Sequence, residues 1–90
     1  MDFEWNHKKA EINQQKHEIS FQQAATVFGD PLAITFDDPD HSTAEYRRLT
    51  FGNTRMGKSI VVSHTERAGV MRIISARRMT RQERKIYETG

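Results

Sequence analysis

The sequence predicts an α+β domain in which two N-terminal helices pack on a mainly antiparallel sheet of about four strands, followed by a short C-terminal helix. Three observations predict this class. Apolar residues first recur with the period of a helix, then alternate with the period of a strand after Pro31, and helix-capping residues return near the carboxyl end. A chain of 90 residues has room for one hydrophobic core, so residues 1–90 are predicted to form a single domain.

The chain is predicted to begin with a short extended segment and a polar helix. Residues 1–5 place Phe3 and Trp5 on one side, as in a strand. Asn6 is a residue type that caps helices, and the helix is predicted over residues 7–18. One polar face of this helix holds residues at helical spacing, namely Lys9, Asn13, Lys16 and His17. This face is either simply solvated or a surface that contacts phosphate.

A second helix is predicted over residues 20–28. Ser20 and Gln23 match a capping box, in which each side chain satisfies a backbone donor of the first turn. Four apolar residues then form one stripe at helical spacing, namely Phe21, Ala24, Ala25 and Phe28. Gly29 and Pro31 predict the end of the helix.

Period-two alternation predicts the strands of the sheet. They span residues 32–37, 45–52, 58–65 and 71–77, with a loop at 37–42 and hairpin loops at 53–57 and 66–70. The apolar run at residues 60–62 predicts a central strand that is buried on both faces. The last three strands are predicted to form an antiparallel meander. Thr80 and Glu83 form a second capping box, which predicts the terminal helix containing Ile86 and Tyr87.

The composition excludes several classes of protein. No cysteine is present, so disulfides, thiol catalysis and cysteine-ligated zinc are excluded. The longest apolar run is far too short to cross a membrane, and no signal peptide is recognisable, so a cytoplasmic location is expected. The four histidines lack the spacing of metal ligands, and phosphate-binding glycine loops are missing, so no metal or cofactor is expected.

The charges are distributed unevenly along the chain. Residues 1–45 contain 3 Lys/Arg against 9 Asp/Glu, a net charge of −6, and residues 46–90 contain 11 against 3, a net charge of +8. The formal total of +2 is therefore a cancellation. This asymmetry favours a nucleic-acid partner, an acidic protein partner, or both. It also predicts a basic side of the sheet.

Charged side chains within the predicted strands are the main candidates for a functional site. Glu45 and Arg47 alternate with Leu49 and Phe51, which predicts that all four share a core or rim face. Their charges indicate either a rim ion pair or a polar pocket. Arg72 is predicted on one face with Ile74 and Ala76, and Arg77 on the other. These arginines indicate either charge protection of an edge strand or stabilisation of phosphate.

A nuclease that works without a metal ion needs a base for the ribose 2′-hydroxyl, an acid for the leaving 5′-oxygen and cations for the phosphate. His17, His41 and Glu45 are candidates for the first two roles. Candidates for the third role are Arg47, Arg72 and Arg77. Arg67, in a predicted hairpin loop, is expected to add general electrostatic attraction. Composition alone does not choose between this chemistry and passive binding of nucleic acid.

The ordered series of residues along nearly the whole chain resembles the BrnT family of type II toxins, which are small ribonucleases with a RelE-like fold. The resemblance consists of Phe3-Glu4-Trp5, Lys9-Ala10, Asn13, Lys16-His17, Ser20-Phe21, Ala24, Val27-Phe28, Asp30-Pro31, His41-Ser42, Glu45, Arg47, Gly52, the block from Arg72 to Arg77, Glu83 and Tyr87. It departs at Glu18, where many members of the family have glycine, and this departure predicts a left-handed backbone at that position.

The resemblance implies an RNA endonuclease that blocks translation and growth, possesses no cofactor and acts on free or ribosome-associated RNA. It also implies a BrnA-like antitoxin partner, through which alone operator DNA would be contacted. By position, it implies a functional surface made of Lys9, Lys16, His17, Glu45, Arg47, Arg72 and Arg77. The complete prediction has His17, Glu45, Arg47, Arg72 and Arg77 as catalytic residues, and Lys9, Lys16, His41 and Arg67 as RNA-binding residues.

Two other hypotheses fit the residues. The chain could be a non-catalytic module that binds nucleic acid or a partner within an antitoxin–operator complex, because the same basic half would serve that role. It could also be a structural domain with solvated charges. Expression of the gene alone separates the first of these from a toxin, because a binding module permits growth and an active toxin arrests it.

Overall fold

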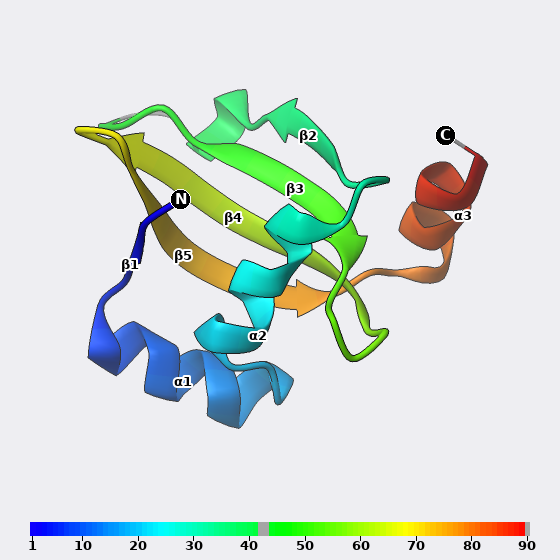
Figure 1. Ribbon diagram of the computed structural model, residues 1–90, viewed down its shortest axis with the longest axis horizontal. Helices are drawn as coiled ribbons and strands as arrows, with labels where there is room; N and C mark the ends of the chain where they lie inside the picture. Colours follow the sequence, from blue (N-terminus) through cyan, green and yellow to red (C-terminus); the bar gives the residue numbers. More distant parts are fainter. Residues whose placement is uncertain (42–43, 90) are drawn as a thin grey trace.

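The computed structural model describes residues 1–41 and 44–89 and has three α-helices and a five-stranded sheet. The elements are β1 (Phe3–Glu4), α1 (His7–His17), α2 (Phe21–Ala25), η1 (Thr26–Gly29), β2 (Ile34–Asp37), η2 (Pro39–His41), β3 (Arg48–Asn53), β4 (Ser59–Arg67), β5 (Val70–Arg78) and α3 (Arg81–Thr89). The strand order is β1-β5-β4-β3-β2 (Figure 1). The α+β prediction is confirmed.

The sheet contains one strand more than the four expected. β3, β4 and β5 form the predicted antiparallel meander, and β2 pairs with β3 in antiparallel fashion. The additional strand is β1, which pairs in parallel with β5 through Phe3 with Met71 and Glu4 with Arg72. It lies within residues 1–5, which the sequence predicted to be extended, but its pairing with β5 was not predicted.

The first helix has the predicted cap at each end. The side chain of Asn6 accepts a hydrogen bond from Lys9 N at 3.0 Å. The helix ends at His17, one residue earlier than predicted, because Glu18 has a left-handed backbone with φ 59° and ψ 32°. Glu18, which stands where many members of the family have glycine, therefore has the left-handed backbone that the resemblance implied.

The second helix is shorter than predicted. Ser20 and Gln23 do form the capping box, with the Ser20 hydroxyl 3.0 Å from Gln23 N. However, the α-helix covers only Phe21–Ala25, and the rest of the predicted helix is the 3₁₀ turn η1. The hydroxyl of Thr26 donates to Gln23 O at 2.6 Å, which favours this tighter turn.

The predicted strand ends also need correction. β2 begins at Ile34 rather than at residue 32, and β3 begins at Arg48 rather than at residue 45. Before Arg48 the chain leaves the ladder, and the carbonyl of Tyr46 accepts a hydrogen bond from the Thr65 hydroxyl at 2.6 Å. β4 and β5 are longer than predicted, at nine residues each. The predicted loop at 37–42 contains η2, and its last residue, Ser42, lies outside the described residues.

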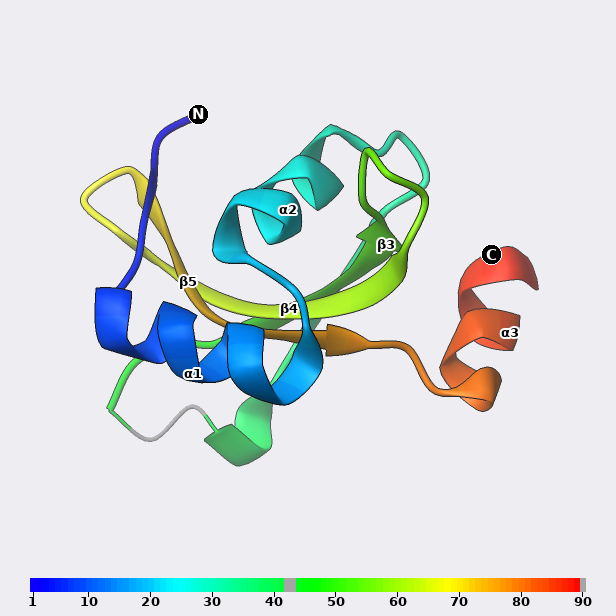
Figure 2. The ribbon, with the colours of Figure 1, turned by 90° about the horizontal axis from the view of Figure 1, so that it is seen from below.

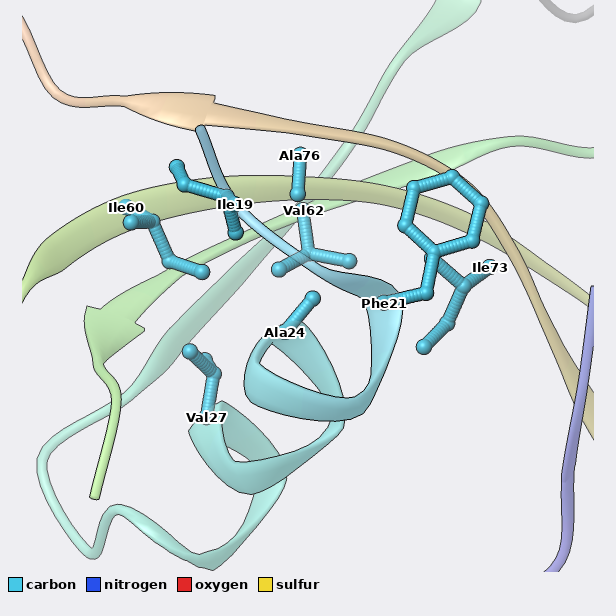
Figure 3. Close-up of a cluster of buried hydrophobic side chains, with 8 residues drawn as sticks. All are labelled: Ile19, Phe21, Ala24, Val27, Ile60, Val62, Ile73 and Ala76. Carbon is cyan, nitrogen blue, oxygen red and sulfur yellow. The ribbon is translucent and has the colours of Figure 1, made fainter. Parts of the chain in front are cut away.

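The hydrophobic core lies between α2 with η1 and one face of the sheet (Figures 2 and 3). The cluster consists of Ile19, Phe21, Ala24, Val27, Ile60, Val62, Ile73 and Ala76. On β3 the core-facing residues are Thr50 and Gly52, so Leu49 and Phe51 lie on the opposite face, where the prediction had left core or rim open. Gly52 is required there because a Cβ atom would lie 2.8 Å from Val27 Cγ1.

A β-bulge changes the faces of β5. Ser63 pairs with Ser75 and His64 pairs with Ile73, so Ile74 is an extra residue in β5. Ile73 and Ala76, three residues apart, consequently both face the core. Arg72 therefore does not share a face with Ala76, which corrects the prediction made from simple alternation.

Asn13 packs against the sheet rather than facing solvent as predicted. Its side chain accepts a hydrogen bond from Ala76 N on β5 and donates one to Ile19 O, each at 3.0 Å. α1 therefore lies along β5, and Asn13 satisfies a backbone donor of the strand. Helical spacing alone grouped Asn13 with the basic residues. It could not reveal the burial of Asn13, because that burial depends on Ala76, 63 residues further along the chain.

α3 is attached by polar contacts near the ends of β3 and β5 (Figure 1). The predicted capping box is present, because Glu83 Oε1 accepts from Thr80 N and the Thr80 hydroxyl accepts from Glu83 N. Tyr87 donates a 2.6 Å hydrogen bond to Asp30 Oδ2, which also accepts from Asn53 N. This contact raises the pKa of Tyr87 to about 12. No residue of α3 is buried.

Candidate functional site

The predicted site residues of β4 and β5 share the sheet face opposite α2, which we call the open face. Antiparallel partners place their side chains on the same face, and Thr65 pairs with Arg72 whereas Val61 pairs with Arg77. Thr65 and Val61 alternate with the core-facing Val62 and the buried His64. Arg72 and Arg77 therefore lie on the open face together.

The register extends this face across the sheet. Its middle row crosses four strands and consists of Phe36, Leu49, Ser63 and Ser75. Along β5, Ser75 lies between Arg72 and Arg77. Phe36 lies at the far end of the same row, on β2. Figure 2 shows α2 on one side of the sheet and η2 on the other, so η2 borders the open face.

One charged cluster lies where β4 and β5 meet at their hairpin. Arg67 donates to Glu45 Oε2 at 2.9 Å, and Arg47 Nε lies 3.4 Å from Glu45 Oε1. The hydrogen bond from Arg67, with the charge of Arg47, holds the pKa of Glu45 below its usual range although partial burial opposes the shift. Arg72 lies nearby on β5, and its Nη1 is 3.7 Å from Glu4 Oε1. Glu45 is therefore ionised at neutral pH and held between two guanidinium groups.

A second cluster surrounds Arg77. Its guanidinium donates to both carboxylate oxygens of Glu83, at 2.8 and 2.9 Å. This bidentate contact lowers the pKa of Glu83 to about 2, despite the opposing effect of burial, and raises that of Arg77. Because Glu83 also caps α3 through Thr80, the helix and the arginine hold each other in place.

The end of α1 adds two basic residues to the Arg77 cluster. An open groove of about 550 Å³ is lined by Lys16 and His17 of α1 and by Arg77 and Arg78 of β5. Lys9 lies seven residues before Lys16, about two helical turns earlier. Together with Ser75 it lines an adjoining hollow of about 200 Å³. α1 thus brings Lys9, Lys16 and His17 to the β5 edge of the open face.

The predicted residues therefore fall into two groups on one side of the molecule. Along β5, Arg72 and Arg77 are about 15 Å apart at the usual rise of a strand. Lys16 and His17 lie at the Arg77 end, whereas Glu45, Arg47 and Arg67 lie at the other. His41 is separate from both groups, because it is in η2 and its Nδ1 lies 3.0 Å from Asp38 Oδ2. Asp38 N in turn donates to Arg47 O, so η2 adjoins the second group.

The expected basic side of the sheet is accompanied by acidic side chains. Each open-face arginine has a carboxylate beside it, in the pairs Arg47–Glu45, Arg67–Glu45, Arg72–Glu4 and Arg77–Glu83. The acidic and basic halves of the sequence are therefore interleaved in space. Such carboxylates orient the planar guanidinium groups, which have five donors each and can bind phosphate with those left over.

Sequence reasoning missed the roles of several residues in this arrangement. Glu83 was recognised as a helix cap, but its contact with Arg77 was not, although both are close in sequence. Ser63 and Ser75 were not considered, since nothing in their local sequence marks them. Within residues 1–41 and 44–89, no three histidine or acidic side chains lie close enough together to hold a metal ion. Among the same residues, no helix is long and apolar enough to cross a membrane.

Comparisons with known proteins agree with this fold. A family model described as the ribonuclease toxin BrnT of type II toxin–antitoxin systems matches residues 5–83. The crystal structure of the Brucella abortus ribonuclease toxin BrnT is similar, with a TM-score of 0.71 and 20% sequence identity, and the match covers 90% of this chain and 99% of that chain. No curated protein matches significantly. Because the family model spans most of the chain, this protein belongs to the BrnT family of ribonuclease toxins of type II toxin–antitoxin systems.

Proposed function

We propose that this protein is an RNA endonuclease that needs no metal ion and uses the 2′-hydroxyl of its substrate as the nucleophile. One observation supports this proposal most strongly. Lys16, His17 and Arg77 line one groove at the edge of an open sheet face that also presents Arg72. An imidazole and several cations are therefore available to one RNA backbone.

The proposed reaction follows from the chemistry of RNA. A base removes the proton of the 2′-hydroxyl, the 2′-oxygen bonds to phosphorus, and the bond from phosphorus to the 5′-oxygen breaks. An acid protonates the departing 5′-oxygen, and a 2′,3′-cyclic phosphate remains. Arg77 and Lys16 would stabilise the charge that develops on the phosphate oxygens. His17 is our candidate for proton transfer because it lines the same groove.

The second group of residues is proposed to hold the flanking RNA. Arg47, Arg67 and Arg72 would contact neighbouring phosphates, with Lys9 and His41 at the two borders. Glu45 can accept a proton because it is ionised, and Glu45→Gln tests whether it acts as the base instead of His17. A large fall in cleavage for Glu45→Gln but not for His17→Gln would move the reacting phosphate to this group.

RNA cleavage by the purified protein in excess chelator tests the proposal. Cleavage should persist and yield 2′,3′-cyclic ends, and a 2′-deoxy substitution at the cleaved nucleotide should abolish it. Arg77→Ala should lower the rate by about 10²–10³-fold, the usual effect of removing one transition-state contact, whereas Arg72→Ala should mainly weaken RNA binding, because Arg72 is proposed to contact a neighbouring phosphate. Arg84→Ala, which removes an exposed cation of α3, is the matched control.

Two results would contradict this assignment. Loss of all cleavage in chelator would mean that the reaction depends on a metal ion. Full cleavage by both arginine variants would place the site elsewhere. Induction of the gene alone in bacteria should also arrest growth and translation, whereas a non-catalytic binding module would permit growth. Comparison of free RNA with ribosome-bound RNA then shows which of them is cleaved.

We also propose that a BrnA-like antitoxin neutralises the toxin by covering the open face, and that operator DNA is bound only through the antitoxin. The interleaved arginines and carboxylates of this face suit a partner with both signs of charge. Arg72→Glu should weaken the complex more than Arg84→Glu, as measured by titration calorimetry. A complex whose structure leaves Arg47 and Arg72 uncovered would rule out neutralisation by direct occlusion.

A further inference from the structure

We infer that Phe36, supported by Phe51, is a stacking subsite for one nucleobase of the RNA. The inference rests on the proposed function. Phe36 is 46% exposed, although it belongs to a regular strand of the sheet. Its ring centroid lies 5.6 Å from that of Phe51, and the rings are nearly perpendicular at 85°. This contact orients the Phe36 ring while much of it remains in contact with solvent.

The register places this pair on the open face. Phe36 pairs with Leu49 and Ile34 pairs with Phe51, so these four side chains share one face of β2 and β3. Phe51 also pairs with Val61, whose other partner is Arg77. The aromatic pair and the arginines proposed to bind phosphate thus belong to one continuous surface.

The charges beside Phe36 suit a nucleotide. Arg47 precedes Leu49 by two residues, and Asp38 N donates to Arg47 O, so the pairing of these segments continues past Phe36. Arg47 lies just outside β3, and this backbone contact places it next to the end of β2, close to Phe36. Asp37 is next to Phe36 in sequence, so its side chain points to the opposite face, where Asp37 Oδ1 lies 3.7 Å from Arg48 Nε. Asp38, two residues after Phe36 and opposite Arg47, lies at the same border with one carboxylate oxygen 3.0 Å from His41 Nδ1. A base on Phe36 would therefore have the Arg47 cation near its phosphate, and the neighbouring carboxylate is one that contacts His41.

This combination favours single-stranded RNA over an apolar peptide. Proteins that bind single strands stack bases on exposed aromatic rings and follow the backbone with cations. An isolated aromatic pair with arginines beyond it matches this pattern. The apolar surface consists of Ile34, Phe36, Leu49 and Phe51, and an apolar helix would need a broader one.

Binding of a short 2′-O-methyl oligonucleotide, which lacks the nucleophile and is not cleaved, tests the subsite. Phe36→Ala should weaken binding about 5- to 150-fold, the effect expected for loss of one stacked base, whereas Phe36→Tyr should bind as wild type. Inorganic polyphosphate, which has no bases, should bind equally to all three proteins. Leu32→Ala is the matched control, because Leu32 is 69% exposed and precedes β2. The salt dependence should not change, because Phe36 has no charge.

The outcomes separate this inference from the proposed function. If Phe36→Ala binds the oligonucleotide normally while Arg72→Ala does not, the stacking subsite is wrong and RNA binding by the open face stands. If wild type neither binds nor cleaves RNA, both fail. If Phe36→Ala loses the co-expressed antitoxin but keeps its affinity for the oligonucleotide, Phe36 belongs to the partner interface. Equal weakening of polyphosphate and oligonucleotide binding by Phe36→Ala would overturn the inference, because it would show that Phe36 supports the charged surface and does not stack on a base.

Discussion

The two faces of the sheet differ sharply although the same strands build both. On the face covered by α2, the side chains of Ile60, Val62 and Ile73 are almost completely buried. On the open face, Val61 and Thr65 of the central strand are also buried, but the positions around them hold arginines, serines and a half-exposed phenylalanine. Successive side chains of a strand point in opposite directions, so one set of strands can provide a core and a binding surface. Stability and function should therefore be separable by substitution.

The largest effect should come from one truncation made on each face. Phe21 is fully buried and its ring lies 6.0 Å from that of Trp5, so Phe21→Ala should lower the free energy of unfolding by about 3–5 kcal/mol. Phe36→Ala should lower it far less, because nearly half of Phe36 is already exposed. Urea denaturation of both variants measures the difference. Equal losses would show that the open face is part of the core.

A polar residue on the covered side should matter nearly as much. Asn13→Ala would leave the buried Ala76 N–H and Ile19 carbonyl without their partner. At about 1–3 kcal/mol for each of the two unsatisfied groups, the expected loss of stability is about 2–6 kcal/mol. Gln14→Ala, at an exposed position of the same helix, is the control and should be nearly neutral. A neutral Asn13→Ala would mean that α1 is not held by this side chain.

Acid titration should separate the two faces by pH. His64, in ring contact with Phe28, has its pKa lowered from 6.5 to about 4, mainly by burial and further by the charge of Arg48. The folded state then binds this proton less well than the unfolded state. Stability should therefore fall by about 3 kcal/mol as the pH drops from 6.5 to 4. His64→Gln should remove this dependence in urea denaturation measured at several pH values.

The open face should respond at lower pH and less strongly. The pKa of Glu83 is about 2, below the ordinary 4.5, because of its contact with Arg77. The stability that this pair adds is present above pH 4.5 and is lost as the pH falls toward 2. Solvent screens the partly exposed pair, so the expected loss is about 1–2 kcal/mol. If Glu83→Gln leaves the profile below pH 4.5 unchanged, the ion pair does not stabilise the fold.

The smallest effect should be a gain of stability between α1 and α2. Glu18 has a left-handed backbone, which costs a side-chain-bearing residue about 1 kcal/mol and glycine almost nothing. Glu18→Gly should therefore raise the free energy of unfolding by about 0.5–1 kcal/mol. Glu11→Gly, within α1, should lower it by a similar amount. Thermal unfolding measures both, and a destabilising Glu18→Gly would mean that the Glu side chain contributes contacts of its own.

About half of the candidate site could be anticipated from the sequence. Lys16 and His17 were grouped correctly with Lys9 because positions seven and eight residues later on a helix fall on the same face. The partnership of these residues with Arg77 follows only from the packing of α1 along β5. The contact between Glu45 and Arg67 likewise depends on segments 22 residues apart. The separation of the site into two groups could not be anticipated, because it reflects the order of strands in the sheet.

The sequence by itself determined the elements whose signals are local. Capping residues such as Ser20 and Thr80 and the change from helical to strand period depend on residues within a turn or two. The left-handed position at Glu18 was inferred only from the resemblance to the family. Only the tertiary structure decided which way the strands face. The bulge at Ile74 reverses the faces within β5, and the approach of Val27 to Gly52 assigns those of β3. Both are long-range contacts, and a local pattern contains no information about which segments will meet.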